Sequence, residues 1–290
     1  MQRMSGVQLL RKLGVRVWVL IWMLGMGAGA GAAHSSARDA CMPRYPPAAT
    51  MERMFDMSLR LGDELNALAP AIRVVVLGRG GQDLSRFGVR YSHLAFAVRG
   101  SDGDWFVIHE LNRCATHYSG LYQEGLANFI GESVLRADVL VAVPRASLQP
   151  ALAGMLLDHG GTARSLHEPR YSLIAYPFSP EYQNSNQWVL EVVAAVAMRE
   201  SAPVGRPQVQ AWLHERGYAP SVMHLKWRER TAARLFVKNA AVTDHPMTER
   251  WSGDYSVSTG DSVIEYLRRQ GMLERVYAVE RDNSSTGEKK

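Results

Sequence analysis

The sequence is poor in cysteine and lacks the residue spacings of common metal and nucleotide sites. Its 290 residues contain only two cysteines and no HExxH or CxxC pattern, which excludes the zinc sites built on those spacings. A glycine-rich stretch at residues 78–83 has no lysine followed by serine or threonine, so it does not predict a P-loop. We therefore expect neither a metal nor a cofactor.

Acidic residues are absent from the first 32 positions, which contain four of the 33 Lys and Arg residues. Four cations occur there: Arg3, Arg11, Lys12 and Arg16. An apolar run at residues 17–24 follows, and a segment rich in Gly and Ala extends to Ala33. This layout predicts a secretory signal peptide over residues 1–32. The apolar run is short for a membrane span, so we expect a periplasmic or secreted protein with no stable span after removal of the peptide.

Loss of the signal peptide lowers the net charge of the chain, which bears on whether the protein binds nucleic acid. It removes four positive charges and no negative ones, so the formal net charge of +5 falls to +1. No basic stripe remains that would indicate nucleic acid binding. Because no long low-complexity linker divides the remainder, we predict a single domain over residues 33–280 and a disordered tail over residues 281–290.

The two cysteines are Cys41 and Cys114. An exported protein meets an oxidising compartment, where these two residues can form a disulfide. Cys41 lies in a proline-rich segment and Cys114 follows a predicted strand, so neither has the helix-start setting that activates a thiolate. We therefore do not expect a cysteine nucleophile.

Hydrophobic periodicity predicts a chain of mixed helices and strands. Expected helices span residues 50–69, 119–130, 146–158, 186–199, 207–216 and 261–270. Expected strands span residues 72–77, 91–98, 105–111, 138–143, 171–176 and 274–279.

Two histidines are expected on one face of a β-hairpin. The strands at residues 91–98 and 105–111 are separated by a turn segment rich in Gly and Asp. If Ala97 pairs with Trp105, then His93 faces His109 directly across the ladder. Such a pair can act as a base and its orienting partner, or can bind a metal together with a third ligand, or can be structural. The lack of an obvious third ligand favours the first role over the second.

A small nucleophile is expected at the start of a helix. Residues 182–187 are polar and lead directly into an apolar helical pattern, which places Ser185 in the first turn. Free N–H groups at this position can stabilise an oxyanion, and Asn184 and Gln187 can help to position it. The alternative is that Asn184 and Gln187 form a capping box and serve only to start the helix.

The order of these motifs resembles the circularly permuted papain-like fold, in particular its NlpC-like and lecithin:retinol acyltransferase-like branches. There the first strand is roughly His-Trp-Ala-Ile-Tyr-Val and the nucleophile motif is Asn-Cys-Glu-His-Phe-Val. Here the matching segments are His-Leu-Ala-Phe-Ala-Val at residues 93–98 and Asn-Ser-Asn-Gln-Trp-Val at residues 184–189. The resemblance covers residues 72–200 and implies an α+β fold with an antiparallel sheet packed on helices. It also implies that His93 is the base, that His109 orients it, and that Ser185 occupies the place of the catalytic cysteine.

Serine in place of cysteine is a departure from this pattern. A serine hydroxyl needs a general base to remove its proton during attack, whereas a thiol is partly ionised near neutral pH. One interpretation is a serine-type hydrolase or acyltransferase that acts on amide or ester bonds of cell-envelope material. The alternative is a catalytically inactive binding or envelope-assembly module that has kept the groove. The ligand can be an envelope peptide, a lipid or a small molecule.

Several longer segments are similar to those of one exported bacterial family. They are Tyr-Ser-His at residues 91–93, Ile-His-Glu-Leu-Asn-Arg-Cys at residues 108–114, Ser-Gly-Leu-Tyr-Gln-Glu-Gly-Leu at residues 119–126, and Tyr-Gln-Asn-Ser-Asn-Gln-Trp-Val-Leu-Glu at residues 182–191. The sequence thereby resembles the domain-of-unknown-function 2145 family. This resemblance implies an exported bacterial protein and no particular activity.

Overall fold

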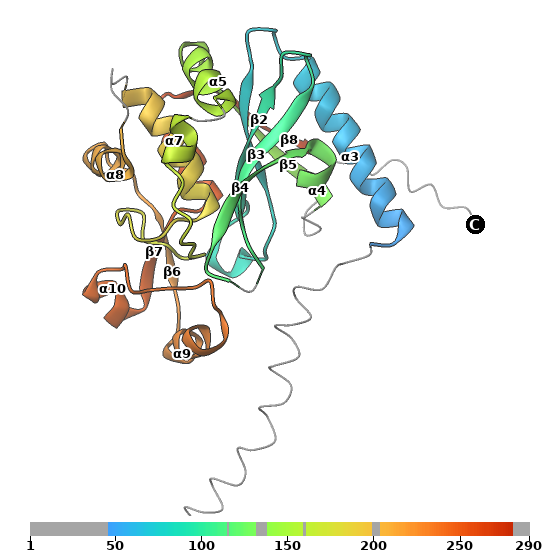
Figure 1. The fold of residues 1–290 in the computed structure, drawn as a ribbon. Helices are drawn as coiled ribbons and strands as arrows, with labels where there is room; N and C mark the ends of the chain where they lie inside the picture. Colours follow the sequence, from blue (N-terminus) through green and yellow to red (C-terminus); the bar gives the residue numbers. More distant parts are fainter. Residues whose placement is uncertain (1–45, 115, 132–137, 159–160, 199–203, 281–290) are drawn as a thin grey trace, which may run out of the picture. The chain divides into compact units, whose positions relative to one another are not determined.

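Strands rich in β-branched residues form one antiparallel sheet, with the order β4-β3-β2-β1-β5-β8 (Figure 1). The strands are β1 (Val74–Arg79), β2 (His93–Arg99), β3 (Trp105–Asn112), β4 (Ser119–Gly125), β5 (Asp138–Pro144) and β8 (Leu273–Glu280). The computed structural model describes residues 46–114, 116–131, 138–158, 161–198 and 204–280. The predicted signal peptide, Cys41 and the predicted tail lie outside these residues.

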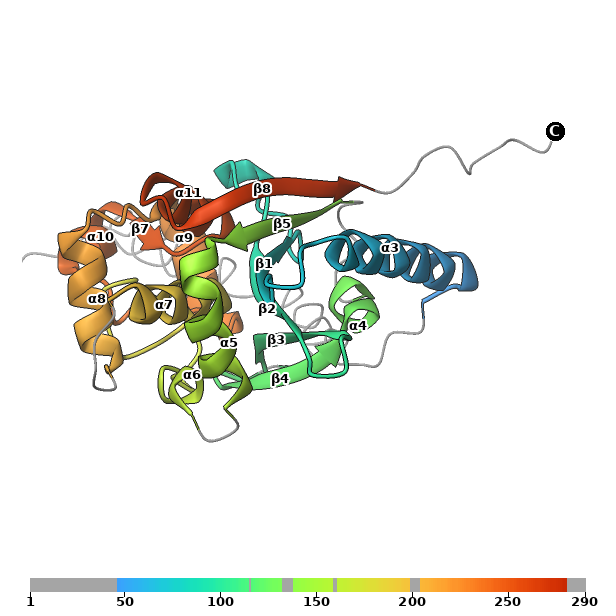
Figure 2. The ribbon, with the colours of Figure 1, turned by 90° about the horizontal axis from the view of Figure 1, so that it is seen from above.

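Helices cover both faces of the sheet (Figure 2). The helices α3 (Ala48–Asn66) and α4 (Leu126–Gly131) pack on one face through Leu61, Leu65 and Phe129. The other face carries α5 (Gln149–Leu157), α7 (Ser185–Met198), α8 (Arg206–Glu215) and α11 (Gly260–Arg269). Because both faces are covered, every residue of β1 is buried. The predicted α+β class, with an antiparallel sheet packed on helices, is confirmed at this level.

The helix that begins at Ser185 lies at the centre of the second helical layer. Residues 185–196 are all buried, whereas the periodicity predicted burial of one face. A helix that is apolar around its whole circumference is typical of a protein interior. Trp188 illustrates its packing, because the indole meets the Phe96 ring edge-on with 5.5 Å between centroids.

Smaller elements complete the described chain. A second antiparallel pair consists of β6 (Ser221–His224) and β7 (Asp254–Val257). The short helices are η1 (Ser85–Phe87), η2 (Ala146–Leu148), α6 (Thr162–Ser165), α9 (Trp227–Phe236) and α10 (Met247–Ser252). None of the helices in the described ranges is long and apolar enough to cross a bilayer.

Two predicted elements were wrong. Residues 119–130 do not form one helix, because residues 119–125 pair along the whole of β3 as strand β4 and only residues 126–131 are helical. The predicted strand at residues 171–176 is irregular apart from one bridge between Tyr171 and Gln183. Residues 119–125 form a strand because they pair with β3, and residues 171–176 form none because they have only the one bridge. Local periodicity does not show whether such pairing occurs.

Candidate functional site

The β2–β3 hairpin has a register two residues away from the predicted one. Ala97 pairs with Val107 rather than with Trp105, because a five-residue loop with Gly103 at a φ of 94° separates Arg99 from Trp105. His93 and His109 are therefore diagonal neighbours, not direct cross-strand partners. A shift of two residues leaves each side chain on its original face. The rings still meet, with 3.1 Å between His93 Nε2 and His109 Nδ1.

The start of α7 is held against the start of β2 by one amide side chain. Asn186 Oδ1 accepts a hydrogen bond of 2.9 Å from the Leu94 N–H, and Asn186 Nδ2 donates one of 3.2 Å to the Ser92 carbonyl. Because Ser92 and Leu94 flank His93, these bonds place its ring beside the first residue of the helix. Ser185 Oγ lies 2.8 Å from His93 Nδ1. The structure thus brings together Ser185, His93 and His109.

The contacts continue from His109 to a carboxylate on the edge strand β4. His109 Nε2 lies 3.4 Å from Glu124 Oε2. One set of tautomers fits all three contacts: His93 Nδ1 accepts from the Ser185 hydroxyl, His93 Nε2–H points to His109 Nδ1, and His109 Nε2–H points to Glu124. The sequence does not predict this contact of Glu124, because its pattern indicates a helix over residues 119–130.

Both histidines are held in their neutral forms. Burial lowers the pKa of His93 well below 6.5, and the positive charge of Arg79 and the neighbouring His109 act in the same direction. Burial, followed by Arg79, lowers the pKa of His109 to about 4. Arg79 is itself buried, donates to the Phe129 carbonyl and stacks over that ring at 4.8 Å. A neutral imidazole can accept a proton from Ser185, but this environment makes the resulting imidazolium costly.

Tyr171 also contacts Ser185. Burial raises the pKa of the Tyr171 hydroxyl, although hydrogen bonds with the side chain and the backbone of Ser185 oppose that effect. The hydroxyl therefore lies at the helix start, where free N–H groups had been expected. The sequence does not predict this contact of Tyr171, because its pattern indicates a regular strand there.

The predicted positioning residues have different surroundings. Asn184 lines the cavity beside Ser185, and its Oδ1 accepts a hydrogen bond of 2.9 Å from the Gln187 N–H, as a helix cap does. The Gln187 side chain donates to Glu191 at 3.1 Å and to the Pro177 carbonyl at 3.3 Å, and it does not line the cavity. Glu191 in turn forms a buried ion pair of 2.7 Å with Arg206, which ties α7 to α8.

A cavity of about 290 Å³ opens onto Ser185, His93 and Tyr171. Arg79 is the one Lys, Arg, Asp or Glu among the described residues that line it. The remaining wall contains apolar residues, namely Leu84, Phe87, Leu173, Ile174, Met223, Leu225 and Val257, and uncharged polar ones, namely Gln82, Ser92, Asn184, Asn186, Ser258 and Thr259. Apolar walls with a few convergent polar groups are typical of small-molecule sites.

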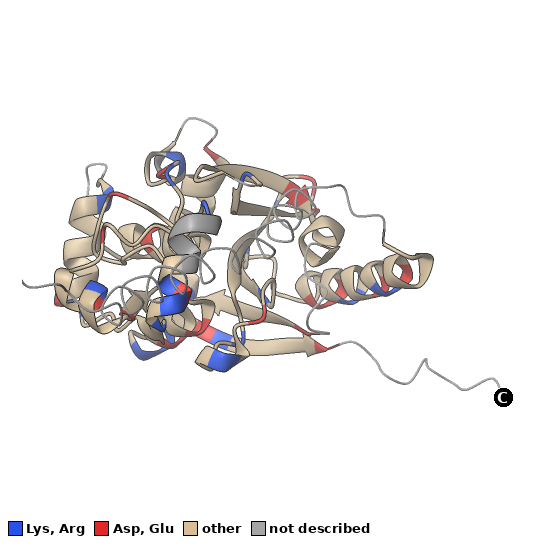
Figure 3. Cartoon of the chain, turned by 90° about the horizontal axis from the view of Figure 1, so that it is seen from below, with Lys and Arg blue, Asp and Glu red and all other residues tan. Residues whose placement is uncertain are grey.

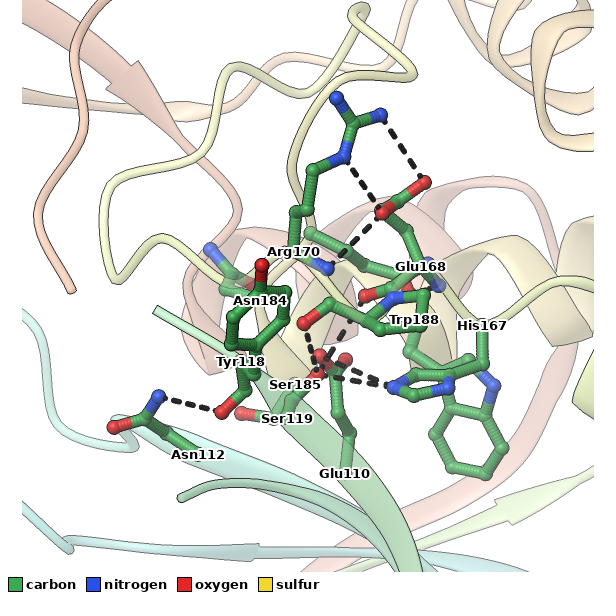
Figure 4. A network of polar contacts seen from close by, with 12 residues as sticks. Glu110, Asn112, Tyr118, Ser119, His167, Glu168, Arg170, Asn184, Ser185 and Trp188 are labelled. Atoms are coloured by element: carbon green, nitrogen blue, oxygen red, sulfur yellow. Dashed lines mark hydrogen bonds and ion pairs between the residues drawn. The ribbon is translucent and has the colours of Figure 1, made fainter. Parts of the chain in front are cut away.

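A second polar cluster contains Ser119, His167 and Glu110 (Figure 4). Ser119 Oγ is 3.0 Å from His167 Nε2, which is 3.9 Å from Glu110 Oε1. Glu110 is completely buried, and burial raises the pKa of its carboxyl to about 8. Burial also lowers the pKa of His167 to about 4, so both groups are mainly neutral at pH 7.

A metal site at the histidines and a disulfide are the two other possibilities that the sequence offers. Within the ranges that the structure describes, no group of three or more His, Cys, Asp and Glu side chains is arranged to hold a metal ion. Cys114 follows β3, and Cys41 lies outside the described residues. The bond between the two cysteines stays a prediction.

Comparison with known families matches residues 66–267 to a family described as "Uncharacterized protein conserved in bacteria (DUF2145)". No curated protein and no solved structure matches the chain significantly.

Proposed function

We propose that this chain, which belongs to the DUF2145 family of bacterial proteins, is a serine-type hydrolase or acyltransferase with a permuted papain-like (NlpC-like) fold. Its substrates are amide or ester bonds of cell-envelope material. The observation that carries the proposal is the 2.8 Å contact of Ser185 Oγ with His93 Nδ1, continued by the 3.1 Å contact of His93 with His109. A nucleophile, its base and an orienting partner in mutual contact form the arrangement that acyl transfer requires.

The reaction begins with attack of Ser185 Oγ on the substrate carbonyl carbon, while the hydroxyl proton passes to His93 Nδ1. The oxyanion forms near the Ser185 N–H and the Tyr171 hydroxyl, two donors that lie together at the start of α7. Collapse of the tetrahedral intermediate expels an amine or alcohol, which takes the proton from His93. Water or an acceptor hydroxyl then attacks the acyl-serine, with His93 again acting as base.

In this proposal, His109 and Glu124 are the groups that stabilise the His93 imidazolium. The nearest cation, Arg79, opposes protonation of His93, and no carboxylate touches the His93 ring among the described contacts. The neutral His109 can accept the His93 Nε2–H, and Glu124 can hold the tautomer in which it does so. Glu124 is therefore a positioning residue in this proposal.

The cavity wall favours substrates with an aliphatic group next to the reacting carbonyl. Burial of such a group against Leu173, Met223 and Val257 contributes about 25 cal/mol for each Å² removed from water. The predicted signal peptide at residues 1–32 supports a periplasmic or secreted location, which is where envelope material would be met.

A binding module that uses the same cavity is the second candidate. Ser185 is 3% exposed, and the Tyr171 hydroxyl already contacts the helix start where an oxyanion would form. An envelope peptide, lipid or small molecule would then bind without turnover. Envelope assembly would be the role of such a module.

Covalent labelling separates the two candidates. We expect a fluorophosphonate probe to modify Ser185, and we expect Ser185→Ala and His93→Ala to abolish the labelling in proteins that stay folded by circular dichroism. Ser258→Ala is the matched control, because Ser258 is a buried serine that lines the same cavity. A folded wild-type protein that is not labelled and turns over no ester would leave the binding module as the function.

A further inference from the structure

Two tryptophans and a methionine are unusually exposed at one end of the described chain. Trp251 is 77% exposed, Trp227 is 65% exposed and Met247 is 56% exposed. They lie on α9 and α10 and line one shallow hollow together with Arg230 and Arg250. We call this surface the tryptophan patch. Large exposed apolar groups that gather at one place mark an interaction surface more often than scattered ones do.

The patch is surrounded by cations. Lys226, Arg228, Arg230 and Arg250 flank the three apolar side chains, and none of these four forms an ion pair within the described residues. Figure 3 looks onto this end of the molecule and colours Lys and Arg blue. The Arg228 guanidinium lies 5.6 Å from the centroid of the Trp227 ring.

The acidic side chains near the patch already have partners. Glu229 pairs with Arg86 at 2.6 Å, Glu249 pairs with His245 at 2.7 Å, and Asp254 pairs with His224 at 2.7 Å. The charge that the surface offers to a partner is therefore positive. Its complement is an anionic surface.

We infer that the tryptophan patch docks onto an anionic lipid bilayer. Indole rings favour the headgroup level of a membrane, and long cationic side chains can place their charges among lipid phosphates while their stems cover apolar surface. Each cation close to an anionic leaflet adds to the attraction. Protein–protein interfaces are also enriched in Trp, Met and Arg, so a protein partner is the alternative that the test would indicate if the patch bound no vesicle. The lipid surface is the one we infer, because it supplies the negative charge that the cations around the patch complement.

The patch adjoins the cavity that contains Ser185. Leu225 lines that cavity and also lines the hollow beside Trp227 and Arg228. A bilayer bound at the patch would therefore lie next to the mouth of the cavity. This docking depends on no catalytic step, so it stands whether Ser185 is a nucleophile or the cavity only binds.

Vesicle binding tests the inference on the full chain in its natively exported form, with its N-terminus established by mass spectrometry. Co-sedimentation would be measured with phosphatidylcholine vesicles and with vesicles that also contain phosphatidylglycerol. We expect binding to the anionic vesicles, weakened by salt, and much weaker binding to the neutral ones. Absence of binding to anionic vesicles would overturn the inference.

Two double variants and one matched control assign the binding to the patch. We expect Trp227→Ser with Trp251→Ser, and separately Arg228→Gln with Arg250→Gln, to lower the partition coefficient about tenfold or more. Phe55→Ser with Leu59→Ser removes another exposed apolar pair, at 52% and 68% exposure, from α3 and should bind as wild type does. The inference would be overturned if both patch variants bound the vesicles as tightly as wild type does. It would also be overturned if the exported protein still contained the apolar run at residues 17–24 and that run were responsible for the binding.

Discussion

The amide oxygen of Asn186 accepts a 2.9 Å hydrogen bond from the backbone N–H of Leu94, across 92 positions of the chain. The same amide donates to the Ser92 and Ser258 carbonyls at 3.2 Å and 3.1 Å. Ser185 precedes Asn186 in the chain, and His93 lies between Ser92 and Leu94, the two residues that Asn186 holds. The distance between Ser185 and His93 therefore depends on this amide.

Replacement of Asn186 tests that dependence. Asn186→Ala leaves a buried N–H and two carbonyls without this partner, so we expect the free energy of unfolding to fall by about 1–3 kcal/mol and labelling of Ser185 to slow more than tenfold. Urea denaturation and the rate of fluorophosphonate labelling are the measurements. Asn239→Ala, which removes one 3.0 Å amide contact with Asn112, is the control and should keep the labelling rate. Equal rates in both variants would show that Asn186 does not position the pair.

The pH dependence of labelling should follow the depressed pKa of His93. His93 acts as a base only when its ring is neutral. Burial together with Arg79 lowers its pKa, so the ring stays neutral as the pH falls past 6.5 and is protonated only at lower pH. We therefore expect the labelling rate to hold constant from pH 8 to below pH 6.5 and to fall at lower pH. Arg79→Met removes the charge and should move this fall to higher pH, whereas Arg79→Lys keeps the charge and should not. A wild-type midpoint at or above pH 6.5 would contradict the assignment of His93 as a buried base.

Glu124 should influence His93 through His109. Glu124→Gln removes the charge that favours the His109 Nε2–H tautomer, so we expect the labelling rate to fall by about tenfold to a hundredfold, the range typical for loss of such an orienting partner. Stability should change little, because Glu124 lies on the edge strand and is 22% exposed. Glu168→Gln is a suitable control, since Glu168 is a similarly exposed carboxylate away from His109. If Glu124→Gln labels at the wild-type rate, the positioning role is lost.

Glu110 should make the protein less stable as pH rises. Its pKa is about 8 in the folded state and near 4.5 when exposed, so the folded state binds more protons between these values. The stabilising contribution is complete below pH 4.5 and is lost as pH rises through 8. Glu110→Gln cannot ionise, and we expect it to gain about 1 kcal/mol or more over wild type between pH 5 and pH 9. Parallel stability curves for the two proteins across this range, obtained by urea denaturation, would contradict the prediction.

Export and the disulfide can be examined on one sample. The N-terminus of the exported protein should begin at Ala33, because Ala30 and Ala32 satisfy the small-residue rule for cleavage. A disulfide between Cys41 and Cys114 would leave no free thiol in the denatured, unreduced protein. Peptide mapping and thiol titration supply both results. Two titrating thiols would reject the disulfide, and an intact N-terminus would reject cleavage.

The local pattern of the sequence determined the elements that carry the reacting groups. Alternating apolar residues defined the hairpin with His93 and His109 on one face, and the polar run before an apolar helix put Ser185 at a helix start. These features depend on neighbours within a few positions of the chain, so they can be deduced without the fold.

Tertiary structure alone decided which other groups meet these three residues. Glu124 reaches His109 because residues 119–125 pair with β3 rather than form a helix, and Tyr171 reaches Ser185 through an irregular segment. Burial, and after it the charge of Arg79 on a different strand, lowers the pKa of His93. The physical reason is the same in each case: strand pairing and burial join residues far apart in the chain, and their energies depend on partners that no local pattern contains.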